Sequence, residues 1–356
     1  AIGAAGAGHV VLTSDSGALV TLENGFEYIA AGNVASVTPG VGQLNTLVTI
    51  EGERLSGSGS AVESVTLSGN DASIEPQTET TVVVRASSSA NAIGDEVTLH
   101  SVSGAVVTVS GLWQYNTEGT VSDISPSVGQ YGTKVVISGQ SLRGSGDSVA
   151  AVTLAGTSVL SLDVEEDGNV EVVADHSDAV TDGDVVLTAN TGATVTATGG
   201  WTYAAEGVVE SVVSLTGQCG SKIPITGSGL FGTGATVASV TLGSVEMEEL
   251  EHQSDTVVRV VVAHADAADA ALATVITADS GAIVTADASW QCLADGTIDA
   301  VIPASGQLGT LVTIDGTSLF GGADELAAAS FGAQEVLVKD ASASQIIVEV
   351  TDRSAG

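Results

Sequence analysis

The sequence is poor in basic residues. Lys and Arg together number 8 against 43 Asp and Glu, which gives a formal net charge of −35. Nucleic acid and anionic membranes are themselves polyanions, so this charge argues against both as partners. Repulsion of this size requires screening by salt, divalent cations or a glycan coat. We therefore expect an extracellular, saline setting, at a cell surface or in a cell appendage.

Aromatic residues and long apolar runs are also scarce. Aromatics make up 3% of the chain although hydrophobic residues make up 44%, so the cores must be filled by Val, Leu, Ile and Ala. No uninterrupted apolar run of about 18 residues occurs, so we expect no transmembrane helix in this sequence. The 44 glycines and the abundance of Val and Thr instead favour short strands joined by tight turns.

Signatures of enzymes and of cofactor sites are missing as well. The chain has no G-x-S-x-G elbow, no P-loop and no Cys–His pair with a third group to orient it. We therefore expect no enzymatic activity, no catalytic residues and no cofactor.

Metal sites find little support. His176 and His264 lie beside acids in corresponding loops, where a solvated or interdomain contact is the more common role. Zinc-ligand spacing and D-x-D-x-D-G loops are absent, and the acidic run 246–251 fits a solvated edge better than a calcium site. No N-glycosylation sequon occurs, whereas the serine clusters 56–60 and 87–89 suit either O-glycans or ordinary turns.

What the sequence does contain is an internal repeat of about 88 residues. Gly-Gln pairs begin at Gly42, Gly129, Gly217 and Gly306, at spacings of 87, 88 and 89. A Leu-x-Gly element follows each pair in phase, then a strand-like VTL segment, a valine-rich run and a closing strand with Trp-x-Tyr. Four landmarks in phase across four copies define a tandem array.

Each repeat has the pattern of a β-sandwich. Segments such as LVTIEG and VVLTAN alternate apolar and polar residues, and turn residues separate them every 8 to 12 positions. About seven short strands per repeat match the size of an immunoglobulin-like domain with two facing sheets. Only 264–273 has a helix-like composition, enough for one short turn. The predicted fold class is therefore all-β, with tandem immunoglobulin-like sandwiches in a rod.

The repeat motif resembles the IPT/TIG family of immunoglobulin-like domains found in plexins and transcription factors. The resemblance rests on ISPSVGQYGTKVVISGQSL from Ile124 and IPASGQLGTLVTIDGTSL from Ile302. It implies an early-set immunoglobulin-like sandwich, often in long extracellular arrays. Asn45, where glycine is usual, and Leu215, which replaces proline, depart from the motif. DNA binding by the transcription-factor branch does not carry over, because the corresponding loops hold almost no Arg or Lys.

Five aromatic residues are predicted to anchor the repeat cores. The closing strand of each repeat supplies the large side chain of an otherwise aliphatic interior. Most aromatics are thereby assigned to fixed core positions, which weighs against a sugar-binding surface. The predicted anchors are Trp113, Trp201, Trp290, Tyr115 and Tyr203.

The only two cysteines, Cys219 and Cys292, fall within one repeat. An even number suits a single disulfide in an oxidising compartment, and two unrelated buried thiols are the alternative. Cys219 lies in the GQxGT motif and Cys292 replaces the Tyr of Trp-x-Tyr. In immunoglobulin-type sandwiches the first segment runs beside the last strand, so a bridge is expected. It would close a loop of about 74 residues and stabilise the fold by about 4 kcal/mol.

The phased landmarks divide the chain into five units. The boundaries are predicted at 1–31, the C-terminal half of a repeat; 32–117, 118–205 and 206–294, three complete repeats; and 295–356, the N-terminal part of another. Their linkers are short, which favours a stiff rod. Joining the last residue to the first would complete a fourth repeat, so we expect a segment of a longer array.

These observations favour a non-enzymatic extracellular structural protein, part of a fibre, appendage or adhesin stalk. Its expected partners are further copies of the array, as a polymer or filament, or other cell-surface proteins. The alternative is a ligand- or carbohydrate-binding ectodomain of a receptor.

Overall fold

The computed structural model describes residues 5–88, 90, 92, 94–213, 216–218, 220–242, 245–247, 249–262 and 272–351. Within these ranges every regular element is a β-strand and no α-helix occurs, as predicted for the fold class. No helix there is long and apolar enough to cross a membrane. The helix-like stretch 264–273 falls mostly outside the described residues.

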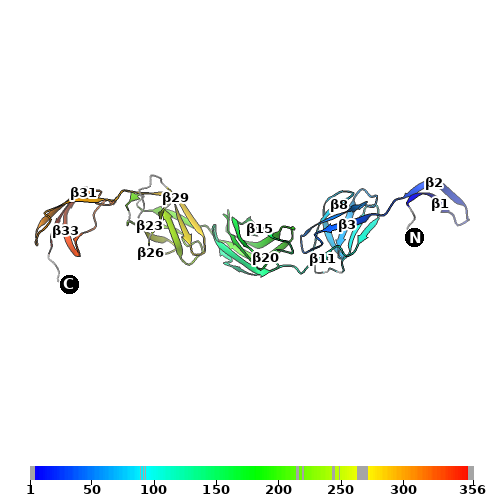
Figure 1. Ribbon diagram of the computed structural model, residues 1–356, viewed down its shortest axis with the longest axis horizontal. Helices are drawn as coiled ribbons and strands as arrows, with labels where there is room; N and C mark the ends of the chain where they lie inside the picture. The colour runs from blue at the N-terminus through cyan, green and yellow to red at the C-terminus, as the bar shows by residue number, and fades with distance from the viewer. Residues whose placement is uncertain are drawn as a thin grey trace.

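The chain forms an elongated row of five units, with its two ends at opposite extremes (Figure 1). The first unit, which we call the N-terminal hairpin, consists of β1 (Gly6–Thr13) and β2 (Leu19–Tyr28). Three complete repeats follow, and the last unit, the C-terminal half-repeat, covers 297–351. Tandem immunoglobulin-like domains in a rod are therefore what the structure shows.

The second complete repeat displays the sandwich most clearly. One sheet has four strands in the order β12-β14-β18-β17, and the facing sheet has five in the order β13-β20-β19-β15-β16. β13 pairs in parallel with the last strand, β20, so the beginning and end of the repeat lie side by side. Its strands are β12 (Thr120–Ser125), β13 (Val128–Gly129), β14 (Lys134–Gln140), β15 (Val149–Leu154), β16 (Thr157–Ser158), β17 (Ser161–Glu165), β18 (Asn169–Val173), β19 (Thr181–Ala189) and β20 (Thr194–Tyr203).

The other two complete repeats follow the same plan. In the first, the long strand β7 joins both sheets into one of seven strands, β10-β9-β6-β7-β8-β5-β3, and β4 pairs with β11. Its strands are β3 (Asn33–Thr38), β4 (Val41–Gly42), β5 (Leu47–Glu53), β6 (Val62–Leu67), β7 (Asn70–Gln77), β8 (Thr81–Arg85), β9 (Val97–Ser101), β10 (Val106–Val109) and β11 (Gln114–Tyr115). Those of the third are β21 (Val208–Val212), β22 (Thr216–Gly217), β23 (Lys222–Ser228), β24 (Val237–Leu242), β25 (Val245–Glu246), β26 (Glu249–Gln253), β27 (Val257–Val261), β28 (Leu272–Ala278) and β29 (Ile283–Cys292).

The C-terminal half-repeat has one sheet, in the order β30-β31-β34-β33-β32. Its strands are β30 (Thr297–Ile302), β31 (Leu311–Thr317), β32 (Ala329–Phe331), β33 (Gln334–Ala341) and β34 (Gln345–Glu349). The described residues of this unit contain no counterpart of the β19–β20 hairpin. Among its described residues, the buried hydrophobic cluster has five members, against 14 in the second repeat.

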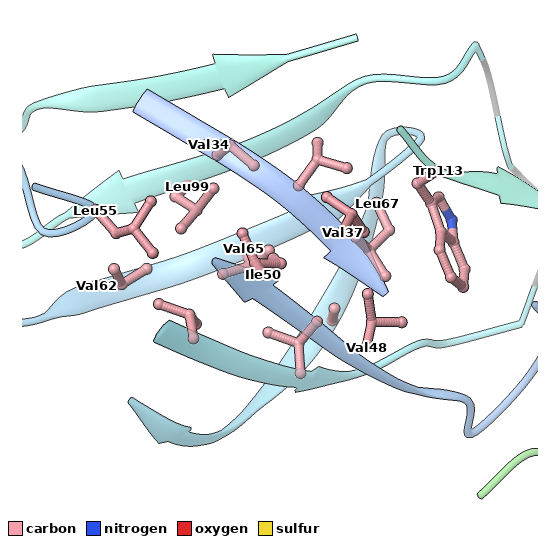
Figure 2. Packing of buried hydrophobic residues seen from close by; sticks show 14 of the residues in the cluster. Val34, Val37, Val48, Ile50, Leu55, Val62, Val65, Leu67, Leu99 and Trp113 are labelled. Atoms are coloured by element: carbon pink, nitrogen blue, oxygen red, sulfur yellow. The ribbon is translucent and has the colours of Figure 1, made fainter. Parts of the chain in front are cut away.

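Each repeat core is built from the inward residues of alternating strands. In β5 of the first repeat, Val48 and Ile50 are buried while Thr49 between them is half-buried, because successive side chains point to opposite faces. Small aliphatic side chains fill most of the space, and Trp113 closes one end of the cluster (Figure 2). A mostly aliphatic interior with few aromatic rings is the packing that the composition predicts.

Candidate functional site: the repeat junctions

The Gly-Gln pairs stand near the start of their repeats in the sequence. In the fold, however, the glutamines of the three complete repeats lie at the end of the repeat that faces the next one. A tight turn fixes them: the backbone N–H of Gln43 donates to Thr46 Oγ1 at 3.0 Å, and that of Gln130 donates to Thr133 Oγ1 at the same distance. Gln43 and Gln130 are fully buried, although they stand in loops. Buried polar side chains require partners, and these come from the following repeat.

At the first junction, Gln43 bonds to two parts of the second repeat. Its Nε2 donates to the carbonyl oxygen of Thr194 at 2.9 Å, and its Oε1 accepts from the N–H of the linker residue Gly119 at 2.8 Å. Two backbone bonds run alongside, from Leu47 N–H to the Thr191 oxygen and from Thr194 N–H to the Leu44 oxygen. The amide thus holds both the linker and a hairpin turn of its neighbour.

The second junction reproduces these four hydrogen bonds. Gln130 Nε2 donates to the Ile283 oxygen at 3.1 Å, and Gln130 Oε1 accepts from Gly207 N–H at 2.8 Å. Lys134 N–H donates to the Ser280 oxygen and Ile283 N–H to the Tyr131 oxygen, both at 2.9 Å. Because the same bonds recur between corresponding residues, the junction is a repeated structural feature of the chain.

At the second junction two glycines of the following repeat have no room for a side chain: one keeps the linker close to its own repeat, and the other faces the glutamine. A Cβ on the linker residue Gly207 would come within 2.2 Å of the Gly229 oxygen, so only glycine fits there. Gly232, from the Leu-x-Gly element, faces Gln130 so closely that a Cβ would lie 3.2 Å from its amide group. The phased glycines found in the sequence therefore meet the phased glutamine of the preceding repeat.

The third junction is only partly formed. Gln218 Oε1 accepts from the linker Gly296 at 2.8 Å, as at the other junctions. Among the described residues of the half-repeat, no hairpin turn lies where it could receive the other end of the amide. A cavity of about 320 Å³ lies there instead, lined by Gln218, Ile223, Phe320 and Gly321 among others. Gln307, the next glutamine in phase, keeps the turn to Thr310 Oγ1 at 2.9 Å but is exposed.

The departure of Asn45 from the motif also acts at a junction. Asn45 occupies the glycine position of GQxGT with a φ of 67°, and the equivalent Gly132 has a φ of 83°. Asparagine tolerates this left-handed conformation better than most residues. Its Nδ2 donates to Thr194 Oγ1 of the next repeat at 2.9 Å, so the substitution adds a bond across the junction.

The described core anchors lie inside their repeats, with Trp113 and Trp201 packed against Gly42 and Gly129 of the Gly-Gln pairs. Trp113, Trp201 and Tyr203 are buried and Tyr115 is half-buried; in each pair the rings meet edge to face, at 5.3 Å and 5.5 Å between centroids. Burial raises the pKa of Tyr203 to about 12, and the nearby carboxylates Asp175 and Glu206 act in the same direction. Burial also raises the pKa of Tyr115. The side chain of Trp290 lies outside the described residues.

The predicted Cys219–Cys292 disulfide also lies outside the described residues, apart from the backbone of Cys292. Cys292 pairs with Gly217 between the parallel strands β22 and β29, so the segment before Cys219 runs beside the last strand. The bridge stays a prediction.

His176 makes contacts at the second junction. Its ring stacks on Tyr131 at 3.7 Å between centroids and 7° between planes, and its Nδ1 lies 2.8 Å from Glu206 Oε1 in the linker. Its loop thus meets both the GQxGT turn and the linker. In the described part of the chain no three His, Cys, Asp or Glu side chains gather as a metal site.

In the sequence the Gly-Gln pairs serve only as landmarks of the repeat, and the glutamine contacts are not identified there. The sequence does contain a signal for these contacts. Gln43, Gln130 and Gln218 recur with the period of the linker glycines Gly119, Gly207 and Gly296, although a turn alone needs no amide side chain.

The IPT/TIG domain model matches residues 120–203 and 297–356, which are the second complete repeat and the C-terminal half-repeat. The chain is a tandem array of immunoglobulin-like domains, and two of its segments are similar to the IPT/TIG domain. No curated protein is significantly similar in sequence.

Solved structures that match the chain include the plexin A4 extracellular region, domains 1 to 10. It is 15% identical with a TM-score of 0.42 over 89% of this chain, which spans 28% of that protein. A Bacteroides ovatus protein, SGBP-B from a mixed-linkage glucan utilization locus, solved in complex with a mixed-linkage heptasaccharide, is 15% identical with a TM-score of 0.22, covering 77% and 73% of the two chains. SGBP-B from a xyloglucan utilization locus of Bacteroides uniformis is 12% identical with a TM-score of 0.24, covering 92% and 95%.

Proposed function

We propose that this chain is a non-enzymatic extracellular structural protein, a segment of a repeat array that forms a cell-surface fibre, appendage or adhesin stalk. One observation carries the proposal: the same four hydrogen bonds lock both junctions between complete repeats. Domains joined by small contacts ordinarily move relative to one another. Here a buried amide joins each repeat to the linker and to the body of the next, which stiffens the row.

The charge and the surface agree with this role. A net charge of −35 keeps rods apart and soluble in a saline medium, which supports an extracellular setting. A carbohydrate-binding ectodomain would present aromatic rings for stacking on sugars. The exposed aromatics of the described chain, Phe26, Tyr28 and Phe331, instead occupy positions that are core positions in the complete repeats.

Small-angle scattering of the dilute monomer tests the proposal. A stiff row gives a maximum dimension equal to that of Figure 1 and a pair-distance distribution with regular inter-repeat maxima. The double substitution Gln43→Ala and Gln130→Ala should blur those maxima, whereas Gln307→Ala, on the exposed glutamine, should leave them unchanged. A wild-type profile that only a broad ensemble of bent chains can fit would refute the structural role.

A further inference from the structure

Both junctions between complete repeats carry a second contact, which joins the loop after the valine-rich run to the acid of the linker. At the first junction, Ser88 Oγ donates to Glu118 Oε1 at 2.8 Å. At the second, His176 Nδ1 lies 2.8 Å from Glu206 Oε1. Each of these acids directly precedes the linker glycine that bonds to the junction glutamine. The contact therefore holds the linker beside the bond that closes the junction.

The serine and the histidine occupy equivalent positions. Ala86 and Ala174 end the two valine-rich runs and make the same backbone bonds to the GQxGT turns. Ser88 and His176 each stand two residues further along. The chain thus places a hydroxyl at one junction and an imidazole at the other, against the same kind of acceptor. The third residue in phase, His264, lies outside the described residues.

The two side chains differ in how they respond to pH. A serine hydroxyl donates the same hydrogen bond throughout the neutral and mildly acidic range. Histidine is the side chain whose charge ordinarily changes between about pH 5 and pH 8, whereas carboxylates in general stay ionised over most of that range. The contact at the second junction therefore changes from a neutral one to an ion pair as the pH falls, and the contact at the first does not.

The titratable groups around the His176 ring are acids or stay neutral. Glu206 faces it from the linker, and Asp175 of its own loop accepts the His176 N–H at 2.8 Å. Asp178 follows in the same loop. Tyr203, at the end of β20, lies near Asp175 and Glu206 and has its pKa raised by burial to about 12, so it keeps its proton. A proton taken up by the ring thus adds a positive charge among carboxylates.

An aromatic ring on the other side of His176 responds in the same direction. The imidazole stacks on Tyr131 at 3.7 Å between centroids and 7° between planes. A cation over an aromatic face is attracted more strongly than a neutral group. The Tyr131 oxygen accepts from Ile283 N–H of the third repeat, so this stack reaches the backbone that crosses the junction. At the first junction the corresponding residue is Leu44, which has no ring.

We propose that protonation of His176 tightens the second junction, which makes it a pH-sensitive joint in the row while the first junction keeps a constant strength. Acid should strengthen the contacts to Glu206 and Tyr131, and a rise through neutral pH should weaken them again. The inference rests on the stiffening role proposed for the junctions and assigns a regulation to one of them.

The exposure of the pair sets the size of the effect. The His176 side chain is 61% exposed and that of Glu206 36%. Ion pairs this close to solvent are weak and are screened by salt. We therefore expect a graded change of about threefold in the opening of the junction at low ionic strength, and no all-or-none transition.

Hydrogen exchange of two linker amides tests the proposal within one molecule. The N–H groups of Gly119 and Gly207 both follow a glutamate and both donate to a glutamine Oε1 at 2.8 Å. Their intrinsic exchange rates are therefore alike at every pH, and the ratio of their measured rates compares the opening of the two junctions. Between about pH 7.5 and about pH 5.5, exchange at Gly207 should slow about threefold relative to Gly119.

Reciprocal substitutions provide matched controls. His176→Ser copies the first junction into the second and should make the ratio independent of pH. Ser88→His copies the second into the first, so that exchange at Gly119 should acquire a dependence on pH. Both side chains are exposed, and both variants should fold. Unchanged exchange in the core strands β14 and β18, and in β5 and β8 for the other variant, would confirm this.

A wild-type ratio that is the same at both pH values would overturn the proposal. So would a pH dependence that persists in His176→Ser, because another group would then be its source. The scattering test of stiffness is made at a single pH and is independent of this ratio. A bent, flexible row with a pH-dependent ratio would refute the stalk and leave the joint, and a stiff row with a constant ratio would do the reverse.

Discussion

The hairpins β1–β2 and β19–β20 share a sequence pattern, a register and a register shift, yet one is exposed and the other forms the centre of a sandwich. The comparison separates two contributions to the fold. Local sequence, through the Gly17 and Gly192 turns and alternating valines, specifies the shape and register of the hairpin. Burial, which supplies most of the free energy of unfolding, comes from the sheet that receives it.

The largest expected loss of stability comes from one substitution made at the same position of both hairpins. Leu187→Ala should destabilise the second repeat by about 2–5 kcal/mol, because it opens a cavity in a closed core. Leu12→Ala, the same change at the exposed counterpart, should leave the monomer's stability within about 0.5 kcal/mol. Hydrogen exchange of each hairpin under increasing denaturant measures both values. Equal losses would mean that the N-terminal hairpin is already buried in solution.

A second pair of substitutions compares an occupied junction with an open one. Gly132 and Gly309 both have a φ of 83°, so alanine costs about 1 kcal/mol at either position from backbone strain alone. At Gly132 the added Cβ would also lie 2.7 Å from Ile283 and 2.9 Å from the Gly281 oxygen, whereas Gly309 has nothing within 4 Å. Gly132→Ala should therefore cost about 1–3 kcal/mol more. Thermal unfolding followed repeat by repeat checks the difference.

The glutamines give the third comparison. Gln130→Ala leaves the half-buried Gly207 N–H and Ile283 oxygen without their partner and should weaken the junction by about 1 kcal/mol. Gln307→Ala removes an exposed amide and should change stability by less than about 0.5 kcal/mol in the monomer. Limited proteolysis at the linker 204–207 reports the loosening directly. Equal cleavage of both variants and the wild type would contradict the proposed role of the amide.

The smallest effect distinguishes the two aromatic pairs by pH. Burial raises the pKa of Tyr203 from its usual value near 10 to about 12, so the folded repeat keeps the phenol protonated where the unfolded chain loses its proton. This contribution to stability is complete below about pH 10 and is lost as pH rises toward 12. In the wild type the unfolding midpoint should be lower at about pH 11 than at about pH 9. This difference should become smaller in Tyr203→Phe and should stay the same in Tyr28→Phe. A wild-type-like pH dependence in Tyr203→Phe would exclude Tyr203 as its source.

The fold could be predicted because its sequence pattern recurs several times along the chain. The period of Gly42, Gly129, Gly217 and Gly306, with strand alternation between them, leads to tandem sandwiches without knowledge of any contact. A single copy would have given a much weaker signal, since short strands alone are ambiguous.

The junctions could not be predicted from the same pattern, for a physical reason. Gln43 bonds to Gly119 and Thr194, which lie 76 and 151 residues further along the chain. Local periodicity reports which face of a strand is buried, whereas these bonds depend on how one repeat is placed against the next. The backbone of the glutamine is part of a turn within its own repeat, and its side chain bonds to the next repeat.

The parallel pairing of the first and last segments has a mechanical consequence. When such a row is pulled, force enters a repeat at the linker before β12 and leaves at the end of β20. The hydrogen bonds between β12 and β14 and between β13 and β20 are then loaded in shear, along the strands. They resist the force together instead of breaking one at a time. Extension under tension is a rate process set by the unfolding barrier. A row of such repeats should bear a sustained pull and yield one repeat at a time.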